Sequence, residues 1–436
     1  MMKTGVSMLA VCLAAALSEA AVSGVTISQD ASTARVTVTY DLDVDAIVTL
    51  DMTTNGVSIG AANMKRLVGD VNRLVAAGDG KTICWFPADA FPGNVITNGS
   101  LAAIVTAWSP ENPPDYLVCD LSVTNGISYY VAQEALPYAV TNDIYKTTHL
   151  VMRRIHATGR PWRMGSPVQK ELGDINGAET TITIPHMVVL TNDYWIGVYP
   201  VTQRQYYLLT GGFRDGGIAT AGFKTAADAA MCPMENISFE DIRGSANEWP
   251  ANGHAVGGAL LKMRALTGLA YLDLPTEAQW EYACRAGTGS AYNSGKECTT
   301  DRTSGTGCSA MAEVGWYGGN AYNYGNSDKH THPVGLKLAN RWGLYDFHGN
   351  VWERCLDWFA TGTAYSDTFA DGWASGAPTI EPVGPASGTH RVARGGDWFS
   401  GPLYARSCYR YGGNDVTLTT YRSDKIGFRL ACVIEK

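Results

Sequence analysis

The first quarter of the chain alternates between short apolar runs and turn residues. From about residue 22 to residue 122, runs rich in Val, Ile and Thr are separated by Asn-Gly, Gly-Asn or Pro-Pro turns. These residues favour extended backbone, and alternation of apolar and polar positions places one face of a strand in a core. The pattern predicts an all-β sandwich over 22–122, built from the runs VTISQ, ARVTVTYDL, AIVTLDM, KTICWF, LAAIVTAW and YLVCDLS.

Six or seven short strands at this spacing are typical of an immunoglobulin-like sandwich. One stretch, 63–77, breaks the alternation and fits either one helical turn or a long excursion at a sheet edge. The same part of the chain contains no nucleophile–base pair and no cluster of metal-ligand residues. We therefore expect a spacer or adhesion module here rather than a catalytic domain.

Beyond residue 122 the hydrophobic pattern changes. Residues 123–148 are interrupted by Asn-Gly and Pro, which we interpret as a linker, and a strand is expected at 149–155. Thr202 and Thr276 each precede a Gln by three residues, which is the form of a capping box at a helix start. Long irregular stretches separate the predicted helices. The pattern therefore predicts an α+β domain of low secondary-structure content over 149–436.

Composition places the chain among globular proteins with a substantial core. Its 436 residues suggest two or three domains, and 45% of them are hydrophobic against 17% that are charged. The formal net charge of -8 provides no electrostatic footprint for nucleic acid, so we expect no nucleic-acid partner.

The first twenty residues have the three parts of a secretory signal peptide. Lys3 supplies the positive start, 6–17 is an apolar run, and Ser18-Glu19-Ala20 offers small residues for cleavage. The run is too short to span a bilayer, and no later segment predicts a transmembrane helix. We expect a mature protein that begins near Ala21 and is secreted, periplasmic or held at the cell surface.

Export permits disulfide bonds. Ten cysteines include Cys12, which leaves with the signal peptide, so nine remain and at least one thiol is free. Cys298 and Cys308 flank a Gly/Ser/Thr loop and form the expected local pair. No Cys-x-x-Cys occurs, so a structural zinc site is not expected.

The stretch 343–359, GLYDFHGNVWERCLDWF, packs tryptophans and carboxylates around a Gly-Asn turn. Trp352 and Trp358 need a rigid apolar setting. The carboxylates of Asp346 and Glu353 are costly in such a setting unless a cation or several hydrogen bonds satisfy them. The stretch therefore predicts a tight corner, clamped either by a metal ion or by hydrogen bonds.

Six motifs occur between residues 150 and 435: WIGVYPVTQRQY (195–206), LPTEAQWEYACRAG (274–287), THPVG (331–335), GLYDFHGNVWE (343–353), RVARGGDW (391–398) and IGFRLA (426–431). Together they resemble the formylglycine-generating enzyme family, also called the sulfatase-modifying factor domain. The resemblance implies an elaborated C-type-lectin-like fold for 149–436, preceded by the all-β sandwich. It also implies an ancestral activity, the oxidation of a cysteine in a client such as a sulfatase.

The resemblance implies a structural calcium ion at the predicted corner. Its ligands match the side chains of Asp346 and Glu353 and the backbone oxygens of Gly349 and Val351. Calcium takes six to eight oxygens, which two carboxylates, two carbonyls and water can supply. The alternative is that both carboxylates only accept hydrogen bonds from backbone amides of the corner. The family's second calcium site falls in the loop 320–328.

The resemblance also implies a copper site and a second disulfide. In the family, copper(I) is held by two cysteines shortly after a Gly-Gly-Ser motif, because soft thiolates suit that ion. Here Asp397 stands in place of the serine, and Ser400 and Ala405 stand in place of the cysteines. A serine and an alanine cannot bind copper(I), so we expect neither copper nor oxidase activity. The family's CRAG disulfide implies a Cys284–Cys408 bond.

Another metal chemistry has weaker support. His330 and His332 are two residues apart, which on a strand places both rings on one side. However, His332 belongs to THPVG, where the resemblance implies a scaffold histidine. Related iron sulfoxide synthases carry an added helical domain with a histidine cluster, whereas this chain has β patterning and no histidine before His149.

The segment between Arg394 and Gly427 predicts a ligand-binding surface. Its aromatic residues alternate with Ser, Gly, Asn, Asp and Arg, and tyrosine-rich loops of this kind give large contact areas at low entropic cost. The layout also resembles variable ligand-binding proteins diversified by retroelements. The alternative is that these aromatic residues brace the core, as we expect for Trp398. The candidate ligand-binding residues are Trp398, Phe399, Tyr404, Tyr409, Arg410 and Tyr411.

Two functions remain open from the sequence. In the first, the second domain keeps the fold and presents the aromatic segment to a protein or glycan ligand. In the second, it remains a copper-dependent oxidase acting on a cysteine of sulfatase-like clients. The replaced cysteine pair favours binding.

Overall fold

The computed structural model describes 20–30, 32–87, 101–165, 185–211, 226–245, 249–251, 253, 255–298, 307–321, 330–360, 377–412 and 418–434, without the side chains of 226–228. Residues 1–19 of the predicted signal peptide and 322–328 of the loop 320–328 lie outside these ranges. The chain divides into two compact units, Met1–Pro113 and Pro114–Lys436.

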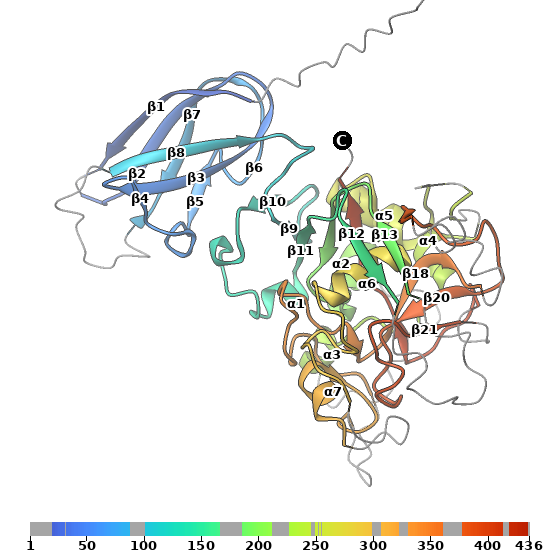
Figure 1. Cartoon of the computed structure of the whole chain (residues 1–436). Helices are drawn as coiled ribbons and strands as arrows, with labels where there is room; N and C mark the ends of the chain where they lie inside the picture. Colours follow the sequence, from blue (N-terminus) through green and yellow to red (C-terminus); the bar gives the residue numbers. More distant parts are fainter. Residues whose placement is uncertain are drawn as a thin grey trace, which may run out of the picture. The chain divides into compact units, whose positions relative to one another are not determined.

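The first unit is all β and contains two antiparallel sheets (Figure 1). One has the order β1-β2-β7-β5, and the other has the order β4-β3-β6 with β8 paired to β3. The elements are β1 (Val22–Gln29), β2 (Val36–Leu42), β3 (Ala46–Thr54), β4 (Val57–Ser58), the 3-10 turn η1 (Ala61–Asn63), β5 (Leu67–Gly69), β6 (Arg73–Val75), β7 (Gly78–Trp85) and β8 (Leu101–Trp108).

Inward-facing side chains of the two sheets form one core. Along β2 every second residue is buried, as the sequence pattern predicts for a strand with one face inside. Val36, Val38 and Tyr40 of this strand pack with Val48 and Trp85 in a single hydrophobic cluster. The stretch 63–77, whose structure the sequence left open, contains the two short strands β5 and β6.

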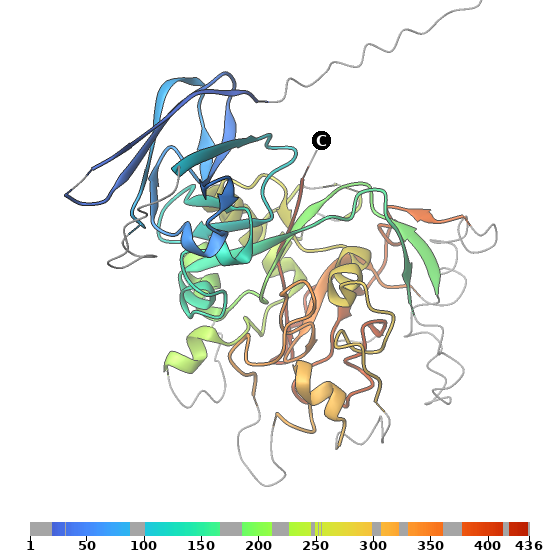
Figure 2. The same ribbon diagram turned by 60° about the vertical axis from the view of Figure 1, so that its left-hand side comes forward.

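The second unit combines short strands and helices with long irregular connections (Figure 2). Its elements up to β15 are β9 (Tyr116–Asp120), β10 (Ile127–Tyr130), η3 (Gln133–Ala135), α1 (Ile144–Thr147), β11 (His149–Ile155), β12 (Pro161–Met164), β13 (His186–Val189), β14 (Tyr194–Gly197), α2 (Gln203–Thr210), α3 (Ala226–Met231), α4 (Phe239–Arg243), α5 (Gly258–Thr267) and β15 (Leu272–Asp273).

The remaining elements carry most of the motifs quoted for the family resemblance. They are α6 (Glu277–Arg285), α7 (Ser309–Val314), β16 (Gly315–Trp316), β17 (His348–Gly349), β18 (Trp352–Trp358), β19 (Thr379–Ile380), β20 (Arg391–Arg394), β21 (Arg410–Tyr411), β22 (Ile426–Gly427) and β23 (Ala431–Val433). The predicted α+β class is therefore confirmed for this unit.

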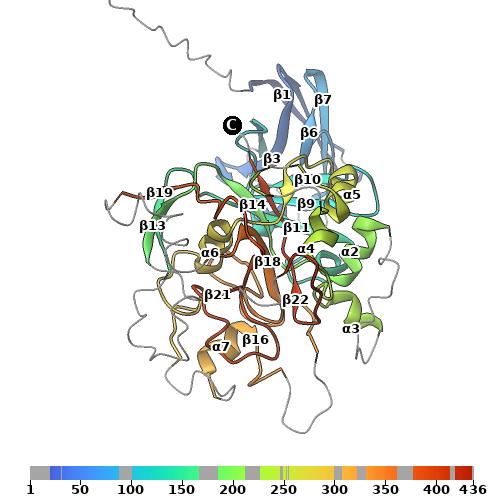
Figure 3. The same ribbon diagram turned by 90° about the vertical axis from the view of Figure 1, so that its right-hand side faces the viewer.

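A six-stranded sheet, β10-β9-β11-β14-β23-β15, forms the centre of the second unit. Its strands alternate between two cores, because successive side chains point to opposite faces. Leu117 and Met152 contribute to a cluster with residues of α2, α4 and α5, which lie together in Figure 3. Val118 and Val151 contribute to a cluster with Trp280 of α6. Helices thus cover both faces of the sheet.

The predicted domain boundary is wrong. The run YLVCDLS, assigned to a first domain over 22–122, contains β9, which pairs with β11 of the second unit from His149↔Asp120 to Arg153↔Tyr116. The predicted linker 123–148 contains β10, which extends the same sheet. The boundary between the two units lies at Pro113/Pro114. The prediction misplaced it because the strand pattern alone does not show which partner a strand pairs with.

The local helix signals are confirmed. Thr202 and Thr276 cap α2 and α6, and in each case the side chain of the Gln three residues later accepts from the capping residue's backbone N–H. Gly211 follows α2 in the left-handed conformation, with φ 75°. Within the described ranges we find no helix that is both long and apolar enough to cross a bilayer.

Candidate functional site

The predicted corner lies at the turn between β17 and β18. Gly349 has φ 75°, and a Cβ there would lie 1.9 Å from the backbone oxygen of Trp316, so only glycine fits. Asn350 follows with φ 65°. Its carboxamide accepts from the backbone N–H of His332 and donates to the His332 carbonyl, both at 3.0 Å. Backbone pairing and an amide clamp therefore hold this corner.

Glu353 is buried next to the corner and bonded through both oxygens. Arg429 donates from Nη2 to Oε1 at 2.8 Å and from Nε to Oε2 at 3.0 Å. The indole N–H of Trp280 donates to Oε2 at 2.6 Å. A bidentate arginine–carboxylate pair combines charge with a fixed geometry. Arg429 therefore supplies the positive charge that the buried carboxylate requires.

Asp346 has one engaged and one free carboxylate oxygen. Oδ2 accepts the backbone N–H of Gly335 at 2.6 Å, whereas Oδ1 is buried without a hydrogen-bond partner among the described residues. Burial raises the pKa of Asp346 to about 6. A free oxygen of this kind suits a cation, but Glu353 already gives both oxygens to Arg429 and Trp280. The calcium site at Asp346, Glu353, Gly349 and Val351 therefore stays a prediction, with Arg429 already supplying one positive charge to Glu353.

Ser400, which stands in place of the first copper-binding cysteine and is called the first copper position, belongs to a closed turn. Asp397 Oδ1 accepts the backbone N–H groups of Phe399 and Ser400 at 2.7 and 2.6 Å. Its Oδ2 accepts the indole N–H of Trp352 at 2.8 Å and the Ser400 hydroxyl at 3.0 Å. Burial raises the pKa of Asp397 despite these bonds. Asp397 thus fixes the turn and the hydroxyl of Ser400.

Ala405, which stands in place of the second copper-binding cysteine and is called the second copper position, is part of the core. Ala405 is 1% exposed, and a Cβ added to Gly396 would lie 2.9 Å from the Ala405 Cβ. The Ala405 carbonyl accepts from Nδ1 of His348 at 2.6 Å, and Nε2 of His348 accepts the backbone N–H of Asn293 at 3.0 Å. Burial lowers the pKa of His348 to about 4, so its ring is neutral. Ser400 and Ala405 do not fit copper(I), because neither side chain offers a thiolate.

The cysteines follow the sequence predictions in part. The Cys298–Cys308 disulfide is present, with Cα atoms 5.6 Å apart. The implied Cys284–Cys408 bond is not formed in this structure, where both cysteines are buried. Cys284 Sγ lies 3.7 Å from Nε2 of His348, and burial raises its pKa to about 12. Burial also raises the pKa of Cys408. Both thiols are therefore protonated and packed.

Some of the aromatic residues predicted to bind a ligand are exposed to solvent. Phe399 is 45% exposed, and Lys425 Nζ lies 3.9 Å from its ring centroid. Tyr421 is 38% exposed, and Tyr404 and Tyr411 are half-buried. We call Phe399, Tyr404, Tyr411 and Tyr421 the aromatic surface.

Three of the predicted ligand-binding residues are not at the surface. Trp398, Tyr409 and Arg410 are buried, so their assignment to a binding surface is wrong. Trp398 donates its indole N–H to the Asp424 carbonyl at 3.1 Å. Arg410 donates from Nη2 to Glu277 Oε2 at 2.8 Å. Trp398 and Arg410 join distant parts of the core, as the alternative interpretation proposed for Trp398.

The histidine pair also belongs to the scaffold. The rings of His330 and His332 have centroids 5.5 Å apart. His332 Nε2 lies 3.0 Å from the Ala321 carbonyl, and its ring stacks on Trp316 at 3.9 Å. Across the described ranges, no three His, Cys, Asp or Glu side chains gather as a metal site would require.

Sequence reasoning missed the buried arginine–glutamate network around α6. Glu281 accepts from Arg285 Nε at 2.8 Å and from Arg394. Arg429 bonds Glu353 from 76 residues away. The signal was present, because all three arginines stand inside motifs quoted above, CRAG, RVARGGDW and IGFRLA.

Comparison with known proteins identifies the second unit. The model of the Sulfatase-modifying factor enzyme 1-like domain matches 156–434. The formylglycine-generating enzyme of Streptomyces coelicolor is 35% identical over 161 residues, which cover 36% of this chain and 46% of that protein. The serine/threonine-protein kinase pkn1 of Chlamydia caviae is 35% identical over 160 residues, which cover 36% of this chain and 20% of that protein. The chain spans less than half the length of these relatives.

Among solved structures, the Treponema denticola variable protein 1 is similar, with a TM-score of 0.43 and 25% sequence identity. The similarity covers 68% of this chain and 97% of that chain.

Proposed function

This chain belongs to the sulfatase-modifying factor family, and we propose that it is an exported member that binds a protein or glycan ligand instead of oxidising cysteine. The proposal rests on the state of the two copper positions. Family membership describes the scaffold, whereas activity depends on the side chains at the site.

The replacement of both thiolate positions carries the proposal. Ser400 is held by Asp397, and Ala405 packs against Gly396 in the core. Copper(I) prefers soft sulfur ligands, which a hydroxyl and a methyl group do not provide. The nearby thiols of Cys284 and Cys408 are buried and carry raised pKa values, so they do not compensate.

The aromatic surface supports binding in place of oxidation. Phe399 and Tyr421 expose large rings, and Lys425 covers one side of Phe399. Exposed aromatic side chains on a rigid scaffold give contact area at low entropic cost. Tyr404 and Tyr411 pack against a buried cluster that contains Trp352, Tyr409 and Ile426, which holds this part of the aromatic surface in place.

An array of peptides and glycans tests the binding function. We expect a signal from the full chain that the variant Phe399→Ala loses at least tenfold. Tyr207, which is 40% exposed on α2, provides the matched control Tyr207→Ala, and this variant should keep the signal. A ligand bound equally by all three proteins would show that the aromatic surface is not the site.

The alternative is a copper-dependent formylglycine-generating oxidase. Oxygen uptake on a Cys-x-Pro-x-Arg peptide, with copper supplied, distinguishes the two functions when the enzyme of Streptomyces coelicolor is assayed in parallel. We expect turnover from that enzyme and none from this chain. Catalytic turnover by this chain would overturn the binding proposal.

We further propose that the first unit is an immunoglobulin-like spacer or adhesion module and that the protein is secreted, periplasmic or at the cell surface. The two antiparallel sheets around one core support the first statement. Lys3 and the apolar run 6–17 support the second. Fractionation of cells that express the full chain tests the location.

A further inference from the structure

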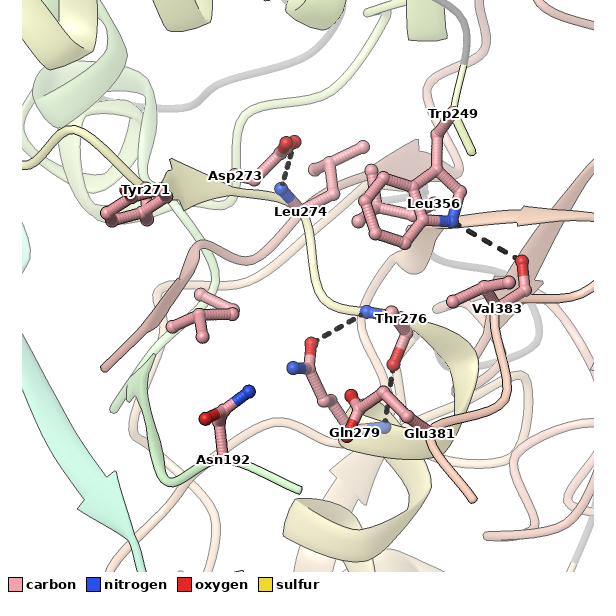
Figure 4. Close-up of a pocket in the computed structure, with 12 residues that line it drawn as sticks. Asn192, Trp249, Tyr271, Asp273, Leu274, Thr276, Gln279, Leu356, Glu381 and Val383 are labelled. Atoms are coloured by element: carbon pink, nitrogen blue, oxygen red, sulfur yellow. Dashed lines mark hydrogen bonds between the residues drawn. The ribbon is translucent and has the colours of Figure 1, made fainter. Parts of the chain in front are cut away.

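A cavity of about 110 Å³ lies at the start of α6, remote in sequence from both copper positions (Figure 4). One water needs roughly 10–15 Å³ of such volume, so the cavity accommodates a small organic group. None of Asp397, Ser400, Ala405 or the aromatic surface lines it. The residues that line it include Asn192, Trp249, Tyr271, Asp273, Gln279 and Glu381.

The capping box of α6 fixes which polar atom of Gln279 faces the cavity. The backbone N–H of Thr276 donates to the Gln279 side chain at 2.9 Å, so the accepting atom must be Oε1. The Gln279 backbone N–H donates in turn to the Thr276 hydroxyl at 3.2 Å. These bonds leave the Nε2 amide group directed into the cavity as a hydrogen-bond donor (Figure 4).

Glu381 provides an acceptor at the same cavity. Its Oε2 accepts the backbone N–H and the hydroxyl of Thr191 at 2.6 and 2.8 Å, which leaves Oε1 available. Glu381 has φ 44°, a conformation that a residue with a Cβ rarely adopts. Backbone strain of this kind clusters at functional sites and persists where surrounding structure enforces it.

The remaining polar lining narrows the ligand further. Asp273 accepts from Arg243 through both oxygens at 2.8 Å, so it is already paired. Asn192 directs its carboxamide toward the same space as Gln279 (Figure 4). The cavity therefore offers the Gln279 donor, the Glu381 acceptor and a carboxamide at Asn192, which can do either.

The opposite wall is apolar. Trp249, Leu356 and Val383 lie together on that side of the cavity (Figure 4), and the Trp249 indole N–H is bonded to the Val383 carbonyl at 3.3 Å. The half-buried ring of Tyr271 lies at one end (Figure 4). A methyl group suits this wall, and the Tyr271 ring suits the apolar face of a sugar ring.

We propose that this cavity binds the acetamido group of an N-acetylated sugar. The ligand carbonyl accepts from Gln279 Nε2, the ligand N–H donates to Glu381 Oε1, and the methyl group contacts the wall formed by Trp249 and Val383. An ammonium group fits this cavity less well than an acetamido group. It only donates hydrogen bonds, and Nε2 of Gln279 would face it with another donor. The site is separate from the aromatic surface, so its binding does not depend on the proposed function.

Titration of the full chain with N-acetylglucosamine, followed by calorimetry or by ligand-observed NMR, tests the proposal. A ligand of about fifteen non-hydrogen atoms predicts a dissociation constant on the order of 1 mM. Glucose, which lacks the acetamido group, should bind at least tenfold more weakly. N-acetyl-lysine methylamide should also bind at least tenfold more weakly, because it has no pyranose ring for Tyr271.

The variant Gln279→Glu separates binding from folding. A glutamate at this position still accepts the Thr276 N–H and keeps the capping box, but it replaces the cavity donor with an acceptor. We expect at least a tenfold loss of affinity with an unchanged circular dichroism spectrum. Glu313→Gln, at a half-buried residue outside the cavity, is the control and should bind like the natural chain.

Three results would overturn the proposal. They are the absence of saturable binding of N-acetylglucosamine, equal affinity for glucose or for the acetylated lysine, and unchanged affinity in a folded Gln279→Glu variant. Loss of ligand binding at Phe399 would leave this site unaffected, so the two proposals fail independently.

Discussion

Replacement of the buried acid Glu235 should change how the stability of the second unit depends on pH. Glu235 is 2% exposed, and its Oε2 accepts the hydroxyl of Thr331 at 3.0 Å. Burial, with a smaller contribution from the negative charge of Asp424, raises its pKa from 4.5 to about 8. The folded protein therefore holds a proton on Glu235 that the unfolded chain releases near pH 4.5.

The sign and size of the effect follow from proton linkage. Because the folded state binds the extra proton, the stability contribution of protonated Glu235 is complete below pH 4.5 and is lost as the pH rises through about 8. Each tenfold difference in proton affinity corresponds to about 1.4 kcal/mol, so the loss reaches a few kcal/mol by pH 8. A glutamine keeps the bond from Thr331 and has no charge to bury.

Thermal unfolding followed by circular dichroism between pH 5 and pH 9 measures this effect. Glu235→Gln should match the natural chain near pH 5 and exceed its Tm by several degrees at pH 8. Glu313, a half-buried residue that pairs with Lys296 at 2.7 Å, provides the control Glu313→Gln, whose difference from the natural chain should stay small at every pH. A constant Tm difference between Glu235→Gln and the natural chain from pH 5 to pH 9 would show that burial of Glu235 does not set the pH dependence.

Three further changes test the interactions that stabilise the second unit. Arg429→Met should lower stability by about 3–5 kcal/mol in chemical denaturation, since it leaves Glu353 buried and unpaired, and the double variant with Glu353→Gln should recover most of that loss. Dialysis against EDTA should leave the Tm within about 2 °C of its value in added calcium, because Arg429 occupies the carboxylate that calcium requires; a fall of 10 °C would contradict this. Reduction of Cys298–Cys308, which are 10 residues apart, should cost about 3 kcal/mol, and the Cys298→Ser/Cys308→Ser variant should become insensitive to reductant.

Features encoded within a few neighbouring residues were predictable. The capping boxes at Thr202 and Thr276 need only a residue and the Gln three positions later, and the structure contains both. Trp280 and Cys284 share the buried face of α6 because their spacing matches a helical turn. The six motifs indicated the family, which the match over 156–434 confirms.

Features that depend on distant partners were not predictable in the same way. The strand pattern of β9 is identical whether it pairs with the first unit or with β11, so the domain boundary was misplaced. Arg410 can be buried because Glu277, 133 residues earlier, accepts a hydrogen bond from its guanidinium group. The sequence also does not show that Glu353 pairs with Arg429, which lies 76 residues later. In each case the partner, and not the residue itself, decides the role.

Copper(I) titration of the purified full chain under anaerobic, reducing conditions shows whether this protein has lost the copper site of its family. We expect no stoichiometric binding, because Ser400 and Ala405 stand where two thiolates are required and Cys284 and Cys408 are buried as thiols. Binding of one equivalent of copper(I) that persists against a competing chelator would contradict it.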